Sequence, residues 1–170
     1  MRVDAQQKGA VLIVGIIVLL ILTLISVTAM QTTSLEEKMA GNMRNKNLAF
    51  QAAEAALRAG EDYLSSATLD PFNDSNGLYQ PSTGSEQRWE MVDWYTPADV
   101  RTYDEDSDGG DLNDLASMPT YIIEELSVDT ETSGSLEAGT LKEGKLYRVT
   151  SRGMGGTANA VVMLQSVYRR

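Results

Sequence analysis

The chain of 170 residues contains no cysteine and no histidine. Without cysteine there are no disulfide bonds and no thiolate chemistry, and without histidine there is no imidazole base. Zinc sites of the usual ligand set are excluded with them. The remaining candidates for a nucleophile do not stand in a recognisable setting such as Ser-x-x-Lys or Gly-x-Ser-x-Gly. We therefore expect a protein that is not an enzyme and that requires no cofactor.

A basic patch is missing as well. Lysine and arginine number 14 against 24 aspartates and glutamates, which gives a formal net charge of −10. An acidic chain without a basic patch repels phosphate backbones, so nucleic acid is not an expected partner. The absence of cysteine leaves the compartment open, because a periplasmic domain can do without disulfides.

One uncharged stretch, residues 9–35, dominates the N-terminal part of the chain. As a helix rising about 1.5 Å per residue, it would cross a hydrocarbon core of roughly 30 Å. We therefore predict a transmembrane helix over residues 10–32. Arg2 and Lys8 precede this helix and Glu36 and Glu37 follow it. The positive-inside rule then places the N-terminus in the cytoplasm and the bulk of the chain in the periplasm.

The helical pattern continues beyond the apolar stretch. No proline occurs between Thr33 and Leu64, and Pro71 ends the pattern. Apolar residues recur at the spacing of one helix face, which predicts an amphipathic half of the same helix over residues 33–68; they are Leu35, Met39, Met43, Phe50, Ala53, Leu57 and Leu64. Gly41-Asn42 could mark a bend or a melted turn in it.

The C-terminal part changes to a period of two. Segments 121–126, 145–151 and 158–168 are rich in β-branched and aromatic residues, which predicts an antiparallel sheet of three or four strands within residues 119–170. Residues 152–157 predict the hairpin connection between the last two strands. One face of this sheet is expected to pack on Met39, Met43, Phe50 and Leu57. The predicted fold class is therefore α+β, a long N-terminal helix packed on a small sheet.

Residues 69–118 form a loop-rich connection with many turn residues. Trp89, Trp94 and Tyr95 lie within it, and we interpret them as the pins of a small hydrophobic cluster. An acidic loop follows, in which Asp104, Asp106 and Asp108 precede Gly109 in the order of the first half of a calcium loop. Leu115 stands where the twelfth-position acid would be. The loop is therefore either a calcium site or a solvated acidic surface.

The two ends of the chain resemble a known family. A short leader that ends in Lys8-Gly9, followed by a retained apolar helix, resembles the signal of type IV pilins. Residues 30–60 resemble the N-terminal signature of PilX-family minor pilins, and residues 146–153 and 159–168 resemble the C-terminal strands of that family. This resemblance implies a pilin roll and removal of the leader, residues 1–9, by a prepilin peptidase that cuts after Gly9. Ala10 would then be the methylated first residue, where most pilins have phenylalanine. The alternative is an ordinary signal peptide cut near Ala29.

The fifth residue after that cut is Val14, where pilins usually carry a glutamate. In the family picture this carboxylate pairs in lipid with the amine of the subunit already in place. An unpaired carboxylate in lipid costs several kcal/mol, so Val14 suits a subunit with nothing ahead of it; alternatively, it is one more lipid-facing residue.

The resemblance implies a minor pilin that primes or caps a type IV pilus and serves adhesion or twitching motility through the pilus. Its implied partners are other minor pilins, a PilY-type tip adhesin and the major pilin. Before assembly it would be a single-pass protein of the inner membrane, and afterwards part of the fimbrium. Two alternatives remain: a tip pseudopilin of type II secretion, and a membrane-anchored binding module that uses Trp89 and Trp94.

Overall fold

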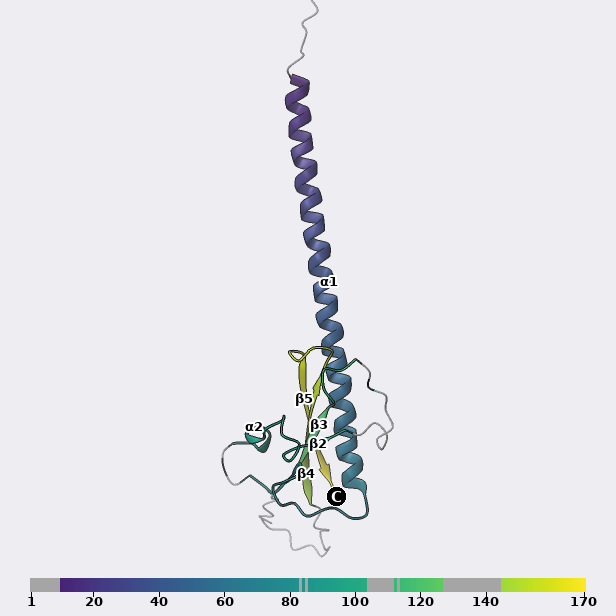
Figure 1. Cartoon of the computed structure of the whole chain (residues 1–170), viewed down its shortest axis with the longest axis vertical. Helices are drawn as coiled ribbons and strands as arrows, with labels where there is room; N and C mark the ends of the chain where they lie inside the picture. Colours follow the sequence, from purple (N-terminus) through teal and green to yellow (C-terminus); the bar gives the residue numbers. More distant parts are fainter. Residues whose placement is uncertain (1–9, 83, 85, 104–111, 113, 127–144) are drawn as a thin grey trace, which may run out of the picture. The chain divides into compact units, whose positions relative to one another are not determined.

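The computed structural model describes residues 10–82, 84, 86–103, 112, 114–126 and 145–170 (Figure 1). The chain divides into two compact units, residues 1–43 and 44–170. Its elements, in order, are α1 (Ala10–Ser65), β1 (Leu78–Tyr79), α2 (Arg88–Met91), β2 (Arg101–Thr102), β3 (Thr120–Leu126), β4 (Leu146–Met154) and β5 (Val161–Arg169).

The first unit consists of the N-terminal part of α1. Within the described residues, α1 is the single helix whose length and composition would allow it to span a membrane. The hydroxyls of Thr23 and Ser26 donate hydrogen bonds of 2.8 Å to the carbonyls of Leu20 and Leu22. These hydroxyls therefore need no water, which suits a helix in lipid. Gly41 and Asn42 are helical, so the melted turn considered there is absent.

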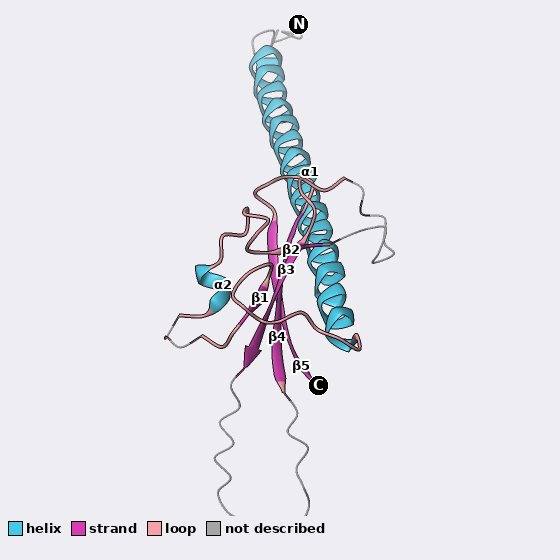
Figure 2. Ribbon diagram, turned by 60° about the horizontal axis from the view of Figure 1, so that its bottom comes forward, coloured by secondary structure: helices cyan, strands magenta, loops and turns pink. Residues whose placement is uncertain are grey.

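The second unit contains a mixed sheet (Figure 2). Its strand order is β1-β3-β4-β5, and β2 also pairs with β3. In the order β3-β4-β5 each long strand is antiparallel to its neighbour, as predicted, with Ile123 opposite Val149 and Val149 opposite Ser166. The prediction of an antiparallel sheet within residues 119–170 is therefore confirmed. The complete sheet is mixed, because β1, which lies before that segment, runs parallel to β3. Both β1 and β2 are two residues long, which is too short for a periodic pattern in the sequence.

The C-terminal half of α1 packs on this sheet through small residues. Its buried positions are Ala49, Ala52, Ala53, Ala56, Ala59, Gly60 and Leu64. The predicted contact through large residues is wrong, since Met39, Met43 and Phe50 are 62%, 68% and 48% exposed. Of the four residues named for that contact, only Leu57 packs against the core, and it is half-buried.

Small residues form this contact because α1 and β4 approach each other closely. A Cβ atom on Gly153 would overlap the carbonyl oxygen of Ala49 and the amide nitrogen of Ala53. Two residues earlier in β4, on the same face, the hydroxyl of Ser151 donates a buried hydrogen bond of 2.7 Å to the carbonyl of Ala53. Only glycine fits at such a close contact. Gly153 lies within β4, and its prediction as part of the hairpin loop is wrong.

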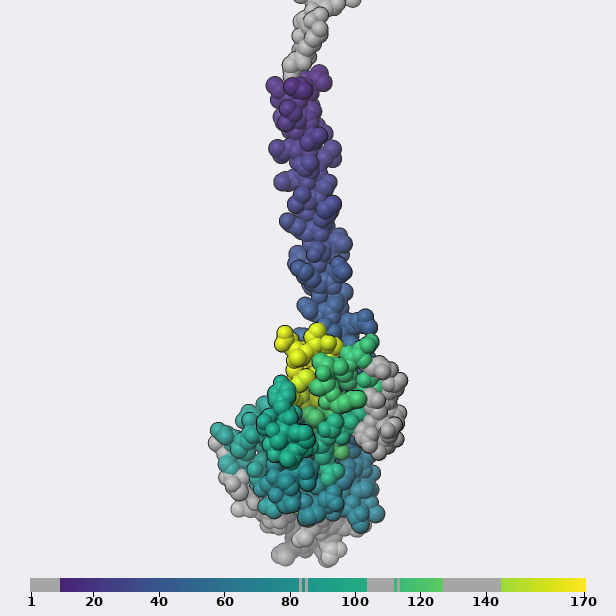
Figure 3. All heavy atoms as spheres, in the orientation of Figure 1, coloured from purple at the N-terminus to yellow at the C-terminus, as the bar shows by residue number. Residues whose placement is uncertain are grey.

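The opposite face of the sheet is covered by the segment between β1 and β2. Tyr79, Val100 and Ile122 form a buried cluster against which Trp89 and Trp94 pack. In the space-filling view the teal and green segments cover much of the visible face of the second unit (Figure 3). The prediction of an aromatic cluster is confirmed for the two tryptophans. It is wrong for Tyr95, whose side chain is 74% exposed.

Candidate functional site

The apolar surface of α1 is the first candidate site. Between Ala10 and Leu35 the helix carries no charged residue, and its large apolar side chains are exposed all round it. Val14 is 58% exposed, and a Cβ on neighbouring Gly15 would meet nothing within 4 Å. Such a surface can enter lipid or pack against other apolar helices, and a small residue allows close helix approach. Of the two predicted processing residues, Ala10 is the first residue of α1 and Gly9 lies outside the described residues.

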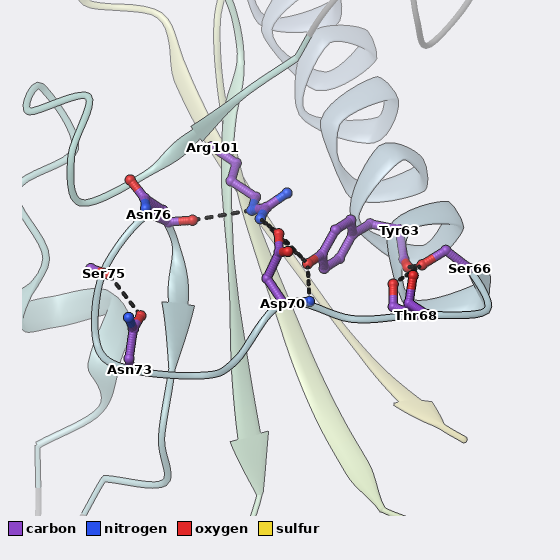
Figure 4. A network of polar contacts seen from close by, with 8 residues as sticks. All are labelled: Tyr63, Ser66, Thr68, Asp70, Asn73, Ser75, Asn76 and Arg101. Carbon is purple, nitrogen blue, oxygen red and sulfur yellow. Dashed lines mark hydrogen bonds and ion pairs between the residues drawn. The ribbon is translucent and has the colours of Figure 1, made fainter.

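A polar network joins the end of α1 to the loop that follows it and to β2 (Figure 4). The guanidinium of Arg101 forms an ion pair of 3.0 Å with Asp70 and lies 4.1 Å from the centre of the Tyr63 ring. The Tyr63 hydroxyl donates to the Asp70 carboxylate and accepts from the Asp70 amide, both at 3.0 Å. The Nε atom of Arg101 donates to the carbonyl of Asn76 at 3.1 Å. These contacts fix residues 66–77 against the helix end.

The same network predicts a pH dependence. Hydrogen bonds from Tyr63 and then from Arg101 lower the pKa of the Asp70 carboxyl in the folded protein. The stability it contributes is therefore complete above its unfolded pKa of about 3.9 and is lost as the pH falls through the lower folded value. We expect Asp70→Asn to lower the midpoint of thermal unfolding at pH 7, and to do so progressively less as the pH falls through the lowered folded-state pKa. Thermal unfolding followed by circular dichroism measures both.

The matched control is Asp62→Asn, an exposed carboxylate on the same helix. It should leave the midpoint unchanged at either pH, because it is not part of the network. An equal loss for Asp70→Asn at pH 7 and at low pH would contradict the assignment of the effect to the ionised carboxylate.

A second polar pair lies on the other face of the sheet, where β3 and β4 bring Glu124 opposite Arg148. Glu124 is 4% exposed, and its carboxylate accepts from Arg148 at 3.4 Å and from the Ser82 amide at 3.2 Å. Arg148 also donates to Gln87 at 3.3 Å. The pair therefore fixes the segment before α2 over the sheet. Sequence reasoning missed it; the available signal was a glutamate within a strand pattern.

Arg170, the C-terminal residue, connects two parts of the second unit through hydrogen bonds. The guanidinium of Arg170 donates to the carbonyls of Ser66 and Ala67, at 2.8 and 3.2 Å. These carbonyls directly follow α1, where a cation is favoured by unpaired backbone oxygens and by the helix dipole. The contact joins the end of β5 to the end of α1.

The calcium prediction is not tested by this arrangement. Asp104, Asp106 and Asp108 lie outside the described residues. Among the residues that are described, no three acidic side chains gather into a group that could hold a metal ion.

An exposed apolar helix continuing into a helix-on-sheet domain is the architecture of a pilin-like subunit with a membrane anchor. Comparison with protein families agrees: the PilX N-terminal family matches residues 8–58, and the C-terminal domain of the type IV pilus assembly protein PilX matches residues 53–170. The chain therefore belongs to the PilX family of type IV pilus assembly proteins. Searches of curated proteins and of solved structures found no match.

Proposed function

We propose that the chain is a minor pilin that acts in the tip complex of a type IV pilus, where it primes or caps the filament. The observation that carries the proposal is Val14, an exposed apolar residue five positions into a helix that begins at Ala10. A subunit that adds beneath another needs a carboxylate at this fifth position, to pair with the N-terminal amine of the subunit already in place. A first subunit lacks that partner, and an unpaired carboxylate in lipid would be costly.

The two halves of α1 suit two successive locations of the subunit, the membrane and then the filament. Before assembly, the apolar half anchors it in the inner membrane and residues 44–170 lie in the periplasm. After the leader is cut at Gly9 and Ala10 is methylated, the helix leaves the lipid and packs against the helices of other minor pilins and the major pilin. A tip adhesin of the PilY type would be carried above it, and adhesion and twitching motility would follow from the filament. The role is structural and not catalytic.

The rival from type II secretion is disfavoured by two observations. Tip pseudopilins carry a large extra helical domain, whereas the described residues after α1 contain one helix, α2, of four residues. The family match names type IV pilus assembly. A membrane-anchored binding module would share the helix but would not be cut at Gly9.

N-terminal processing tests the proposal. Intact mass and N-terminal sequencing of the membrane-purified protein, with a co-expressed prepilin peptidase, should show loss of residues 1–9 and a methylated Ala10. Gly9→Leu should abolish the cut, because a side chain at the cleavage point blocks access to the peptide bond. Gly15→Leu is the matched control: a Cβ there meets nothing within 4 Å, so processing should be unaffected.

A wild-type chain that still begins at Met1, or one cut after Ala29, would overturn the pilin role. The tip position has a separate readout, since a labelled subunit should be found at filament ends and not along the shaft. Calcium at Asp104, Asp106 and Asp108 stays a prediction, for which a calcium titration of the purified chain is the measurement.

A further inference from the structure

A hollow of about 170 Å³ lies on the sheet face opposite α1, within the second unit. Its floor includes a row of three residues that pairing brings side by side: Thr102 of β2, Thr120 of β3 and Arg152 of β4. Trp94 and Tyr95 form part of its wall. None of the contacts described above for the pilin role uses this hollow.

The aromatic wall is held in place although Tyr95 is exposed. The Trp94 indole donates to the carbonyl of Trp89 at 3.0 Å, and the Tyr95 amide donates to the Asp93 carboxylate at 3.0 Å. The Tyr95 hydroxyl accepts a hydrogen bond of 2.8 Å from Arg152, whose guanidinium lies 4.5 Å from the centre of the Tyr95 ring. Fixing a large side chain that is 74% exposed costs conformational entropy with little burial in return. A preorganised aromatic surface recovers that cost when a ligand covers it.

The polar groups of the hollow are only partly used. The hydroxyls of Thr102 and Thr120 make no hydrogen bond to another residue that the structure describes, and the Ser117 hydroxyl donates only to the sulfur of Met154, at 3.1 Å. An apolar ligand would bury the hydroxyls of Thr102 and Thr120 without partners, at a cost of about 1–3 kcal/mol each. The ligand must therefore carry hydrogen-bonding groups of its own.

Charge and size restrict the ligand further. Among the described residues that line the hollow there is no carboxylate, which argues against a metal cation. Arg152 is the one basic residue among them, and its charge is offset by its electrostatic interaction with the Asp93 carboxylate, which argues against an anion. The volume is below the roughly 300 Å³ at which pockets for drug-sized ligands begin, so it holds one ring. The remaining chemistry is a neutral ring with hydroxyls at its edge and C–H bonds on its face, which an aromatic side chain can cover.

We propose that this hollow is a binding site for a single neutral sugar ring. The ring face lies on Tyr95 and Trp94, and the sugar hydroxyls exchange hydrogen bonds with Thr102, Thr120 and Arg152. The proposal is independent of the pilin role, because sugar binding by the purified subunit requires neither processing nor assembly.

Methyl NMR of the full chain tests it. The chain, labelled with ¹³C-methyl methionine, is held in a detergent without a sugar headgroup and titrated with glucose, galactose, mannose, N-acetylglucosamine or inorganic phosphate. Met118 and Met154 line the hollow, and Met39 and Met43 lie on the exposed surface of α1. We expect at least one sugar to shift the Met118 and Met154 signals saturably, with a Kd of about 1 mM or weaker, and to leave Met39 and Met43 in place.

Three variants locate the site. Tyr95→Ala removes an exposed ring and should weaken binding by about tenfold or more. Thr120→Val removes a hydroxyl at constant shape and should weaken it by a smaller factor. Val167→Ala, an exposed position on the same sheet face of β5, is the control and should bind like the wild type. The proposal is overturned if no sugar gives saturable shifts, if phosphate does so instead, or if Tyr95→Ala binds as well as the control.

Discussion

Gly153→Val is expected to be the most damaging single substitution in the second unit. Its Cβ alone would overlap the carbonyl oxygen of Ala49 and the amide nitrogen of Ala53, which are backbone atoms of α1. A side chain can turn away from a clash, but a helix backbone moves only as a whole, so the sheet contact must open along its length. We expect a loss of about 3 kcal/mol or more of unfolding free energy, enough to prevent folding of a marginal domain. Gly153→Ala should already cost a large part of it.

The measurement is denaturant unfolding of the micelle-embedded chain, or the yield of soluble folded protein where the variant does not fold. Gly41→Ala is the matched control, because a Cβ at Gly41 meets nothing within 4 Å and alanine is the better helix former. It should be neutral or stabilising by up to about 1 kcal/mol. Equal stabilities for Gly153→Ala and the wild type would show that α1 and β4 are not in such close contact.

Arg148→Met has the second largest expected effect. It leaves the Glu124 carboxylate, which is 4% exposed, with the Ser82 amide as its remaining partner. Removing one member of a buried ion pair leaves an uncompensated charge, and we expect a loss of about 2–3 kcal/mol because Arg148 itself is partly exposed. Chemical denaturation at neutral pH measures it.

A double-substitution cycle separates the pair from its surroundings. Glu124→Gln combined with Arg148→Met should be less damaging than Arg148→Met alone, because the buried charge is then gone. Arg58→Met breaks an ion pair with Glu54 on the surface of α1 and should change stability by less than about 0.5 kcal/mol. If Arg148→Met lowered the free energy of unfolding as little as Arg58→Met, the Glu124–Arg148 pair would not contribute measurably to stability.

The sequence predicted the long helix and the three long strands, but three of the four residues that it placed at the sheet contact, Met39, Met43 and Phe50, are exposed. Met43 and Phe50 are large and recur at helical spacing, so hydrophobic burial favoured them. The structure instead buries Ala49, Ala52 and Ala53, because a close helix–sheet approach requires the smallest side chains on both elements. Gly153 was misread for the same reason: a glycine usually marks a turn, and here it marks a contact.

The middle of the chain could not be predicted from local pattern. The pairing of β1 with β3 depends on contacts far apart in the sequence, such as the hydrogen bond of 2.7 Å from the Ile123 amide to the carbonyl of Gly77. The register of β3 and β4 likewise places Glu124 opposite Arg148 and Thr120 opposite Arg152. This register cannot be read from residue spacing in the sequence. The processing site proposed at Gly9 and Ala10 is of a different kind, because it rests on a motif in the linear sequence and not on strand pairing.

The use of small residues on α1 also separates two kinds of evolutionary constraint. Within the second unit, Ala53 and Ala56 face the protein's own sheet, whereas Phe50 on the same helix is exposed. Substitutions at the alanine positions are selected through folding, and they are narrowly restricted in size. Substitutions at Phe50 are selected through its contacts outside the domain, so this residue can change without altering the fold of the domain. The exposed side of the helix can therefore vary in sequence while the other side keeps the fold.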